Sequence, residues 1–202
     1  MPRIAEGRPA ATPSSIEQKD RYQRILRAAA HLGAEHGFDH VQMNDVAKDA
    51  NVAIATLYRY FPSKVHLFSS VMRWRVGAYE MEEVPAEGVS ATGVADLLIR
   101  MSREMARTPK LSLAMIQGNS QSYAMGSRDS ALDDERFTRI VQRAAGIAEA
   151  TPDTERQIRL IVSCWFGTLV SLLNGRFSMG QAEDDIRAAC ALLLRPLETT
   201  SH

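Results

Sequence analysis

Residues Asn51–Phe68, NVAIATLYRYFPSKVHLF, place two tyrosines and two cations on one short segment. Tyr58 and Tyr60 carry hydroxyl donors on stiff side chains, and Lys64 lies at the expected beginning of a helix. Hydroxyl, ammonium and helix-end N–H groups commonly bind phosphate oxygens. We therefore interpret Tyr58, Tyr60 and Lys64 as contacts to a nucleic-acid backbone. Alternatively, one tyrosine packs in a small core and Lys64 is a solvated surface residue.

The residues before these tyrosines are small or apolar. Short side chains let a backbone approach base edges in the major groove, where an apolar group can contact the thymine methyl. The expected base-facing surface consists of Ala53, Ile54, Ala55 and Thr56. We expect changes at Ile54 or Thr56 to alter sequence preference.

Helical spacing and turn residues predict the elements that position this segment. The expected helices are Ile16 to about Gly37, Met43–Ala50, Ile54–Tyr60 and Ser63 to about Glu83. Gly37 and Asn51 suit left-handed turns that end helices. Pro62 ends the third helix, and Ser63 can cap the fourth. Short helices joined by such a turn form a helix-turn-helix unit.

The rest of the chain also has helical spacing. After the linker Val84–Ser90, the expected helices are Ala91–Arg107, Lys110–Tyr123, Ser130–Ala150, Thr154–Arg176 and Gln181–Leu194. No alternating β-branched run interrupts them, so the predicted fold is all-α. We divide the chain into a disordered tail (1–15), a helix-turn-helix DNA-binding domain (16–62) and a helical ligand-binding and dimerisation domain (63–198).

Composition narrows the class of protein. The 202 residues carry a net charge of +0, but residues 1–80 hold 11 Lys and Arg against 8 Asp and Glu. This slight basic excess favours a DNA-contacting N-terminal half. The N-terminus lacks the apolar core of a signal peptide, and the two cysteines form no metal-binding pattern, so a cytoplasmic location is expected. The apolar stretch Ile158–Leu173 is short and interrupted by polar residues, so no membrane partner is expected.

Methionines and aromatic residues in the second domain suggest a site for a bulky apolar ligand. Thioethers adapt to irregular shapes, and large aromatic side chains suit apolar pockets. The candidate ligand-binding residues are Met101, Met105, Met115, Trp165, Phe166 and Leu169. Each of them taken singly could equally be a core residue. The last two helices are apolar on more than one face, which predicts burial against a second subunit in a homodimer.

The stretch VQMNDVAKDANVAIATLYRYFPSKVHLF resembles the signature of the TetR family of bacterial transcription regulators. The resemblance implies a homodimeric repressor that binds palindromic operator DNA through Thr56, Tyr58, Tyr60 and Lys64, assisted by Met43 and Asn44. This sequence departs from the family pattern at the N-caps of the two motif helices, because Gln42 and Ala53 replace the usual hydroxyl residues. Both helices of the motif are therefore expected to lack side-chain caps.

The second half, with its PKLSLAM segment and a tryptophan in the penultimate helix, is similar to the KstR-like branch of that family. This similarity implies release from DNA by a steroid- or fatty-acyl-CoA. No cofactor is expected.

Two other classes of protein remain open from the residues themselves. A small all-α enzyme could use the carboxylates of Asp133-Asp134-Glu135, although acidic groups also favour a helix N-terminus. A helical adaptor would keep the fold without binding DNA. His31, His36 and His40 lack the spacing of a metal site, so no metal is expected.

Overall fold

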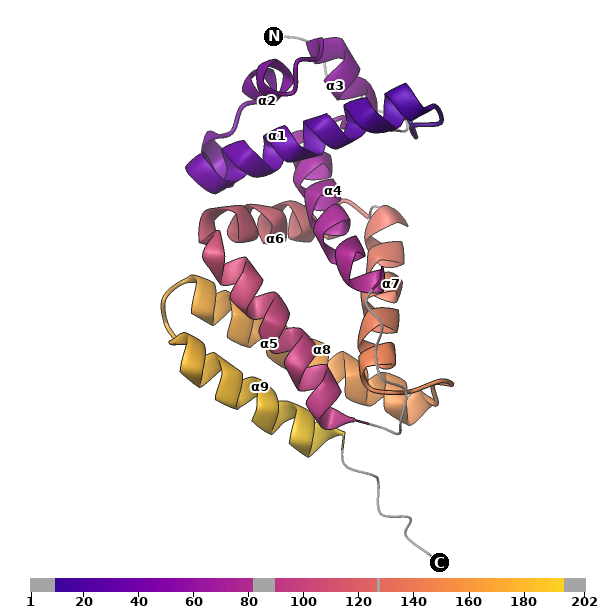
Figure 1. Cartoon of the computed structure of the whole chain (residues 1–202), viewed down its shortest axis with the longest axis vertical. Coiled ribbons are helices and arrows are strands. Elements are labelled where there is room, and N and C mark those ends of the chain that lie inside the picture. The colour runs from indigo at the N-terminus through magenta and orange to yellow at the C-terminus, as the bar shows by residue number, and fades with distance from the viewer. Residues whose placement is uncertain (1–9, 82–89, 127, 195–202) are drawn as a thin grey trace, which may run out of the picture. The chain divides into compact units, whose positions relative to one another are not determined.

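The computed structural model describes residues 10–81, 90–126 and 128–194 (Figure 1). Its helices are α1 (Ile16–His40), α2 (Met43–Asp49), α3 (Ile54–Tyr60), α4 (Lys64–Gly77), α5 (Ala91–Arg107), α6 (Pro109–Ala124), α7 (Arg128–Ala144), α8 (Pro152–Leu173) and α9 (Met179–Leu193). A 3₁₀ turn, η1 (Ala78–Met81), follows α4. No strand occurs within the described ranges, and the all-α prediction is confirmed. Most of the predicted linker, Val84–Ser90, lies outside the described residues.

Turn chemistry predicted the ends of most helices. Gly37 (φ 73°) breaks the helical backbone inside α1, three residues before its end at His40. Asn51 (φ 51°) follows α2, and the Ser63 hydroxyl accepts a hydrogen bond from the His66 N–H as the cap of α4. Two predicted helices are too long. The fourth ends at Gly77 instead of near Glu83, and the seventh ends at Ala144 because the left-handed Gly146 (φ 70°) stops it.

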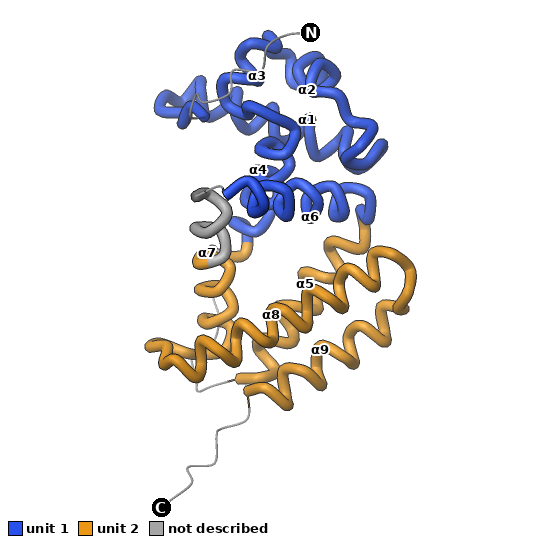
Figure 2. The backbone as a smooth tube through the Cα atoms, turned by 180° about the vertical axis from the view of Figure 1, so that it is seen from behind, with its two compact units in different colours: residues 1–78, 108–133 blue, residues 79–107, 134–202 orange. Residues whose placement is uncertain are grey.

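The described chain forms two compact units (Figure 2). Residues 1–78 and 108–133 make the first, which contains α1–α4 and α6. Residues 79–107 and 134–202 make the second, which contains α5, α8 and α9. Packing therefore places α4 and α6 with the helix-turn-helix, whereas the sequence assigned both to the second domain. The functional boundary at residue 62 stays a prediction.

Helices α1, α4 and α6 enclose the core of the first unit around the fully buried Phe68. A Cβ atom added at Gly118 would lie 2.7 Å from the Phe68 Cβ, and one at Gly33 would lie 2.7 Å from the Phe68 Cε1. The two glycines thus let α1 and α6 approach α4 closely. Lys110 also joins α6 to α1, because its Nζ donates to the Glu35 carbonyl at 2.9 Å.

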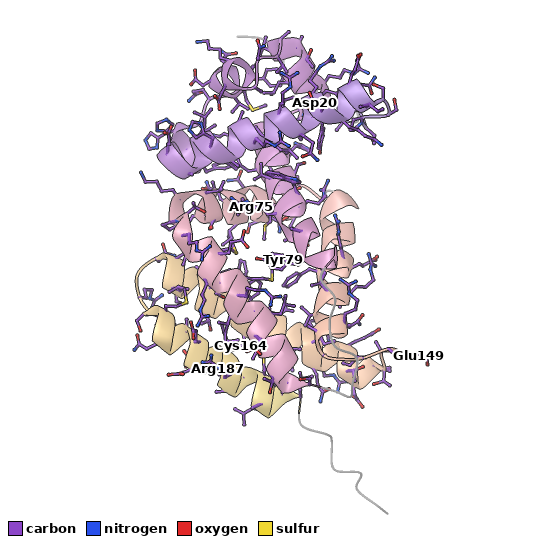
Figure 3. All side chains as sticks on the ribbon, in the orientation of Figure 1. Asp20, Arg75, Tyr79, Glu149, Cys164 and Arg187 are labelled. Carbon is purple, nitrogen blue, oxygen red and sulfur yellow. The ribbon has the colours of Figure 1, made fainter. Side chains whose placement is uncertain are left out.

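Helices α5, α8 and α9 form the second unit around buried aliphatic side chains, with polar links between helices. The Trp165 Nε1 donates to the Ser102 Oγ at 2.9 Å, which joins α8 to α5. Arg103 pairs with Glu183 at 2.7 Å, which joins α5 to α9. Arg187 of α9, labelled in Figure 3, lies 3.4 Å from the same carboxylate. These links satisfy polar groups beside an apolar core.

Helix α8 alone among the described helices is long and apolar enough to cross a membrane, on length and composition only. Only 28% of its apolar window is buried. One such helix is weak support for a membrane span, because helices that pack in a protein interior or interface have the same composition.

We expect the Glu183 pair to make stability depend on pH. The hydrogen bond from Arg103 lowers the pKa of Glu183, more than desolvation raises it. A lowered folded-state pKa adds stability above the unfolded-state value of about 4.3, and this contribution disappears as the pH falls through the folded-state value. Glu183→Gln should therefore have a lower melting temperature than the unchanged protein at pH 7. This difference in melting temperature should disappear in acid. The control is Glu149→Gln, at an exposed position; a deficit that persisted at pH 3 would contradict the assignment.

Candidate nucleic-acid interface

Apolar side chains on one side of α2 and α3 hold the helix-turn-helix in place. Val46 and Ala47 of α2 and Leu57 of α3 are buried. The turn between the helices closes with hydrogen bonds from the Asn51 N–H to the Lys48 carbonyl and from the Val52 N–H to the Ala47 carbonyl. These two bonds and the left-handed Asn51 form a Schellman-type helix end.

An arginine of α1 fixes the same turn. Arg24 donates from Nη1 to the Ala50 carbonyl at 3.0 Å and pairs at 3.2 Å with Asp20. Asp20 of α1 is labelled in Figure 3. This bond satisfies a carbonyl at the end of α2.

The opposite side of α3 is exposed and carries the predicted base-facing residues. Ala53, Ile54 and Ala55 are exposed, and Thr56 is half-buried. Tyr58, one turn further, is 43% exposed. Asn44 is exposed and Met43 half-buried in the first turn of α2. These residues form a surface with small side chains toward the beginning of α3 and a tyrosine beside it, the shape that a major groove admits.

The caps of both helices are as weak as the sequence predicts. Neither Gln42 before α2 nor Ala53 before α3 makes a side-chain hydrogen bond to the helix that it precedes. Such a cap typically contributes about 1 kcal/mol. Both short helices therefore depend on their packing against α1 and on the Asn51 turn.

The placement of Tyr60 at the DNA surface is corrected by the structure. Its side chain is only 3% exposed, and it packs edge-on against the Tyr22 ring with centroids 5.7 Å apart. Its hydroxyl is buried and has no hydrogen-bond partner among the described residues. Tyr60 follows Leu57 by three positions, so both lie on one face of α3. This spacing was the signal that could have separated Tyr60 from Tyr58.

We expect Tyr60→Phe to raise stability. A buried polar group without a partner is unfavourable, so removal of this hydroxyl should increase the free energy of unfolding by about 1 kcal/mol. DNA affinity should stay the same. Tyr58→Phe is the matched control, since it removes an exposed hydroxyl and should change affinity instead of stability. Urea denaturation and DNA titration of both variants measure this, and a loss of affinity in Tyr60→Phe would restore it as a contact.

Lys64 is neither a free surface residue nor a simple phosphate ligand. Its Nζ donates to the carbonyls of Asp39 and Val41 at 3.1 and 3.3 Å and lies 4.7 Å from the centre of the Phe38 ring. The ammonium group thus ties the beginning of α4 to the end of α1. An ammonium has three N–H donors, so one is left at most for a phosphate.

Arg59 is a candidate that the sequence reasoning missed. It is exposed in the last turn of α3, next to Tyr58. A guanidinium group binds phosphate or a guanine edge in a bidentate way. Its position beside a predicted contact was the available signal.

The predicted ligand-binding residues divide between the two compact units, and their role as a site stays a prediction. Met101, Trp165 and Leu169 are buried and Met105 is half-buried, all in the second unit. Met115 is buried in the first unit. Phe166 is 39% exposed, because consecutive residues of a helix point about 100° apart. Trp165 stacks on Phe137, with centroids 5.4 Å apart. The role of Phe166 in a ligand site stays a prediction.

The remaining candidates from the sequence are the histidines of α1 and the acidic cluster Asp133-Asp134-Glu135. His31 pairs with Asp49 at 3.3 Å and Glu35 at 3.7 Å, but no metal-binding group of three or more ligands occurs there. The side chains of Asp133 and Asp134 lie outside the described residues.

Comparison with known proteins agrees with this helix-turn-helix unit and helical second unit. The family model "Bacterial regulatory proteins, tetR family" matches residues 25–71, and "Tetracyclin repressor-like, C-terminal domain" matches residues 89–193. The HTH-type transcriptional repressor KstR of Rhodococcus jostii is 34% identical, over 90% of this chain and 86% of that protein. KstR of Mycobacterium tuberculosis is 30% identical, over 89% and 83%. The chain belongs to the TetR family of bacterial transcription regulators.

Solved structures share the fold. A TetR transcriptional regulator from Rhodococcus sp. RHA1 superposes with a TM-score of 0.81 and 43% identity, covering 92% of this chain and all of that one. FadR of Thermus thermophilus, solved in complex with lauroyl-CoA, has a TM-score of 0.58 and 19% identity, covering 90% and 98%. At that identity the likeness concerns the fold alone.

Proposed function

We propose that this protein is a cytoplasmic, homodimeric repressor that binds a palindromic operator and is released by a bulky apolar effector. The exposed side of α3 is the observation that carries the proposal. Ala53, Ile54 and Tyr58 are exposed there, whereas Leu57 and Tyr60 face the core. Full-length relatives named as repressors support the direction of regulation.

A dimer is needed because α3 has only seven residues. One short recognition helix contacts few base pairs, whereas two related by a twofold axis read two half-sites about 34–36 Å apart. The dimer surface we propose is the outer side of α8 and α9. It holds the exposed apolar side chains of Leu160, Phe166 and Leu192, and a Cβ added at Gly167 would meet nothing within 4 Å.

The effector we propose is a steroid- or fatty-acyl-CoA. The second unit buries Met101, Trp165 and Leu169, and Trp165 donates a hydrogen bond to Ser102 there. Apolar side chains with few polar groups suit an apolar acyl group. The similarity to KstR repressors supports this class, and the FadR complex indicates that the fold can hold an acyl-CoA. An effector acts only through its higher affinity for the protein that is off DNA, typically by about 1–3 kcal/mol.

Selection of duplexes from a random pool tests the DNA-binding part. We expect the intact chain to select two half-sites with dyad symmetry. Thr56→Ala should change the preferred base, and Tyr58→Phe should weaken all duplexes alike. Lys64→Ala should reduce the salt slope by about one if its remaining N–H binds a phosphate. Failure to select any sequence would favour the helical adaptor.

Titration of the protein–DNA complex with lauroyl-CoA, a steroid-acyl-CoA and CoA alone tests the effector. We expect either thioester to release DNA and to quench Trp165 at the same concentrations, with Trp74→Phe isolating that signal. CoA alone should do neither. Equal release from a folded Trp165→Ala variant would place the ligand elsewhere.

A further inference from the structure

The segment just ahead of α1 is hydrogen-bonded to the last turn of α3. The Ala11 N–H donates to the Arg59 carbonyl at 3.0 Å. Ala11 and Pro13 are half-buried, whereas Thr12 between them is exposed, and this alternation is typical of an extended chain. The part of the predicted tail that the structure describes, residues 10–15, is therefore attached to the unit that contains α3.

The other end of this segment is fixed at the beginning of α1. The Ser14 N–H donates to the Gln18 Oε1 at 3.0 Å, and the Ser15 Oγ accepts from the Gln18 N–H at 3.2 Å as the cap of α1. The extended stretch thus has hydrogen bonds at both ends, one set to α1 and one to α3. We call residues 11–14 the strap.

The sequence explains why the end of α3 takes a donor from elsewhere. The last carbonyls of a helix have no partner within that helix. Four positions after Tyr58 stands Pro62, which has no N–H to donate to the Tyr58 carbonyl. Four positions after Arg59 stands Ser63, which is already the extended cap of α4. The Ala11 N–H supplies a partner for the Arg59 carbonyl from outside the helix.

This hydrogen bond lies at the part of α3 that carries two exposed side chains, Tyr58 and Arg59. The helix has seven residues and begins without a side-chain cap. So short a helix depends on its surroundings to stay formed. A hydrogen bond in its last turn limits how far these two side chains can move. Such limits matter because a binding constellation must be held to within about 0.5 Å.

We propose that the strap is a positioning element for operator recognition and that the Ala11 N–H is the group through which it acts. It holds the last turn of α3, so that Tyr58 and Arg59 meet the operator in one arrangement. This inference rests on the proposed operator binding and adds a determinant that lies outside the helix-turn-helix. Binding to DNA of unrelated sequence depends mainly on charge and does not need this placement.

Ala11→Pro tests the strap, because it removes the N–H donor and keeps the length of the chain. The probes are the duplex that the intact chain selects and a duplex of unrelated sequence. One hydrogen bond typically changes an equilibrium by about two- to tenfold, and the proposed dimer contains two such bonds. We expect about tenfold weaker binding to the selected duplex and unchanged binding to the unrelated one. Hydrogen exchange of the α3 amides should become faster, while that of the α6 amides stays the same.

Two further variants control for the methyl group of Ala11 and for the proline ring. Ala11→Gly keeps the N–H donor and should bind both duplexes like the unchanged protein. Thr12→Pro places the ring at the exposed neighbour, whose N–H makes no hydrogen bond within the described residues. Because Thr12 precedes Pro13, its backbone already favours the extended conformation that proline adopts, so this variant should also bind normally.

A pair of deletions tests the strap without introducing a ring. Deletion of residues 2–9 keeps Ala11, whereas deletion of residues 2–13 removes it and leaves the serine cap of α1 in place. We expect the longer deletion to bind the selected duplex about tenfold more weakly than the shorter one. Equal affinity of the two deletion variants would contradict the positioning role.

The outcomes separate the strap from the proposed function. If Ala11→Pro weakened binding to both duplexes equally, the change would reflect only a loss of folded protein, and the positioning role would be overturned. Unchanged binding by Ala11→Pro, or the same loss in Ala11→Gly, would overturn it as well. If the intact chain selected no sequence at all, the proposed function itself would fail. Thermal melting followed by circular dichroism measures the folded fraction of each variant.

Discussion

A Gly167→Glu variant should be a folded monomer that binds the selected duplex about 100-fold more weakly or worse. Nothing lies within 4 Å of a Cβ placed at this residue, so the protomer has room for the new side chain. Replacing glycine within a helix also favours folding by up to about 1 kcal/mol. In the proposed dimer, however, the carboxylate would be buried against an apolar surface without a partner, which is strongly unfavourable.

Gly167→Ala is the matched control for this variant. It has the same gain in helix propensity but adds only a methyl group, so it should stay dimeric and bind DNA normally. Met125→Glu places the same acid at another exposed apolar position, 64% exposed in the first unit, and should also stay dimeric. Sedimentation velocity at micromolar concentration measures the association. A dimeric Gly167→Glu protein would show that the second copy binds another surface.

Phe68→Ala should lower the free energy of unfolding by about 3–5 kcal/mol. Phe68 is 0% exposed, its ring lies 5.4 Å from that of Phe38, and it contacts the two glycines that bring α1 and α6 close. Because the total stability of a domain is about 5–15 kcal/mol, this loss would leave little of the fold at 37 °C. DNA affinity should fall with the folded fraction. Urea denaturation followed by circular dichroism measures the change.

A double-mutant cycle tests whether Gly33 and Phe68 are coupled through their close packing. Gly33→Ala alone should destabilise the protein, since its methyl group would lie 2.7 Å from the Phe68 ring. In the Phe68→Ala background the contacts with the Phe68 ring are absent and the Leu111 Cδ1 contact at 3.0 Å remains, so the same change should cost less. Ile16→Ala, at an exposed residue of α1, should change stability by about 0.5 kcal/mol or less. Additive effects at Gly33 and Phe68 would contradict this account of the packing.

The amino-acid sequence by itself determined the helices and their turns. Gly37, Asn51 and Ser63 act through their own backbone or through a residue three positions away, so their roles are readable locally. The small and apolar residues at the beginning of α3 were readable for the same reason. Tyr60 could also have been assigned to the core from its spacing to Leu57, a signal that the emphasis on its hydroxyl overlooked.

Only the tertiary structure decided which residues satisfy which distant groups. Lys64 donates to carbonyls of Asp39 and Val41, more than twenty positions earlier in the chain, and no local pattern specifies that partner. Helix α6 joins the helix-turn-helix unit because Gly118 and Gly33 admit Phe68, a fit between three separate helices. Ala11 reaches Arg59 in the same way. Such contacts depend on how the helices pack against one another. Close packing and these hydrogen bonds join surfaces that the fold brings together, and not neighbours in the sequence.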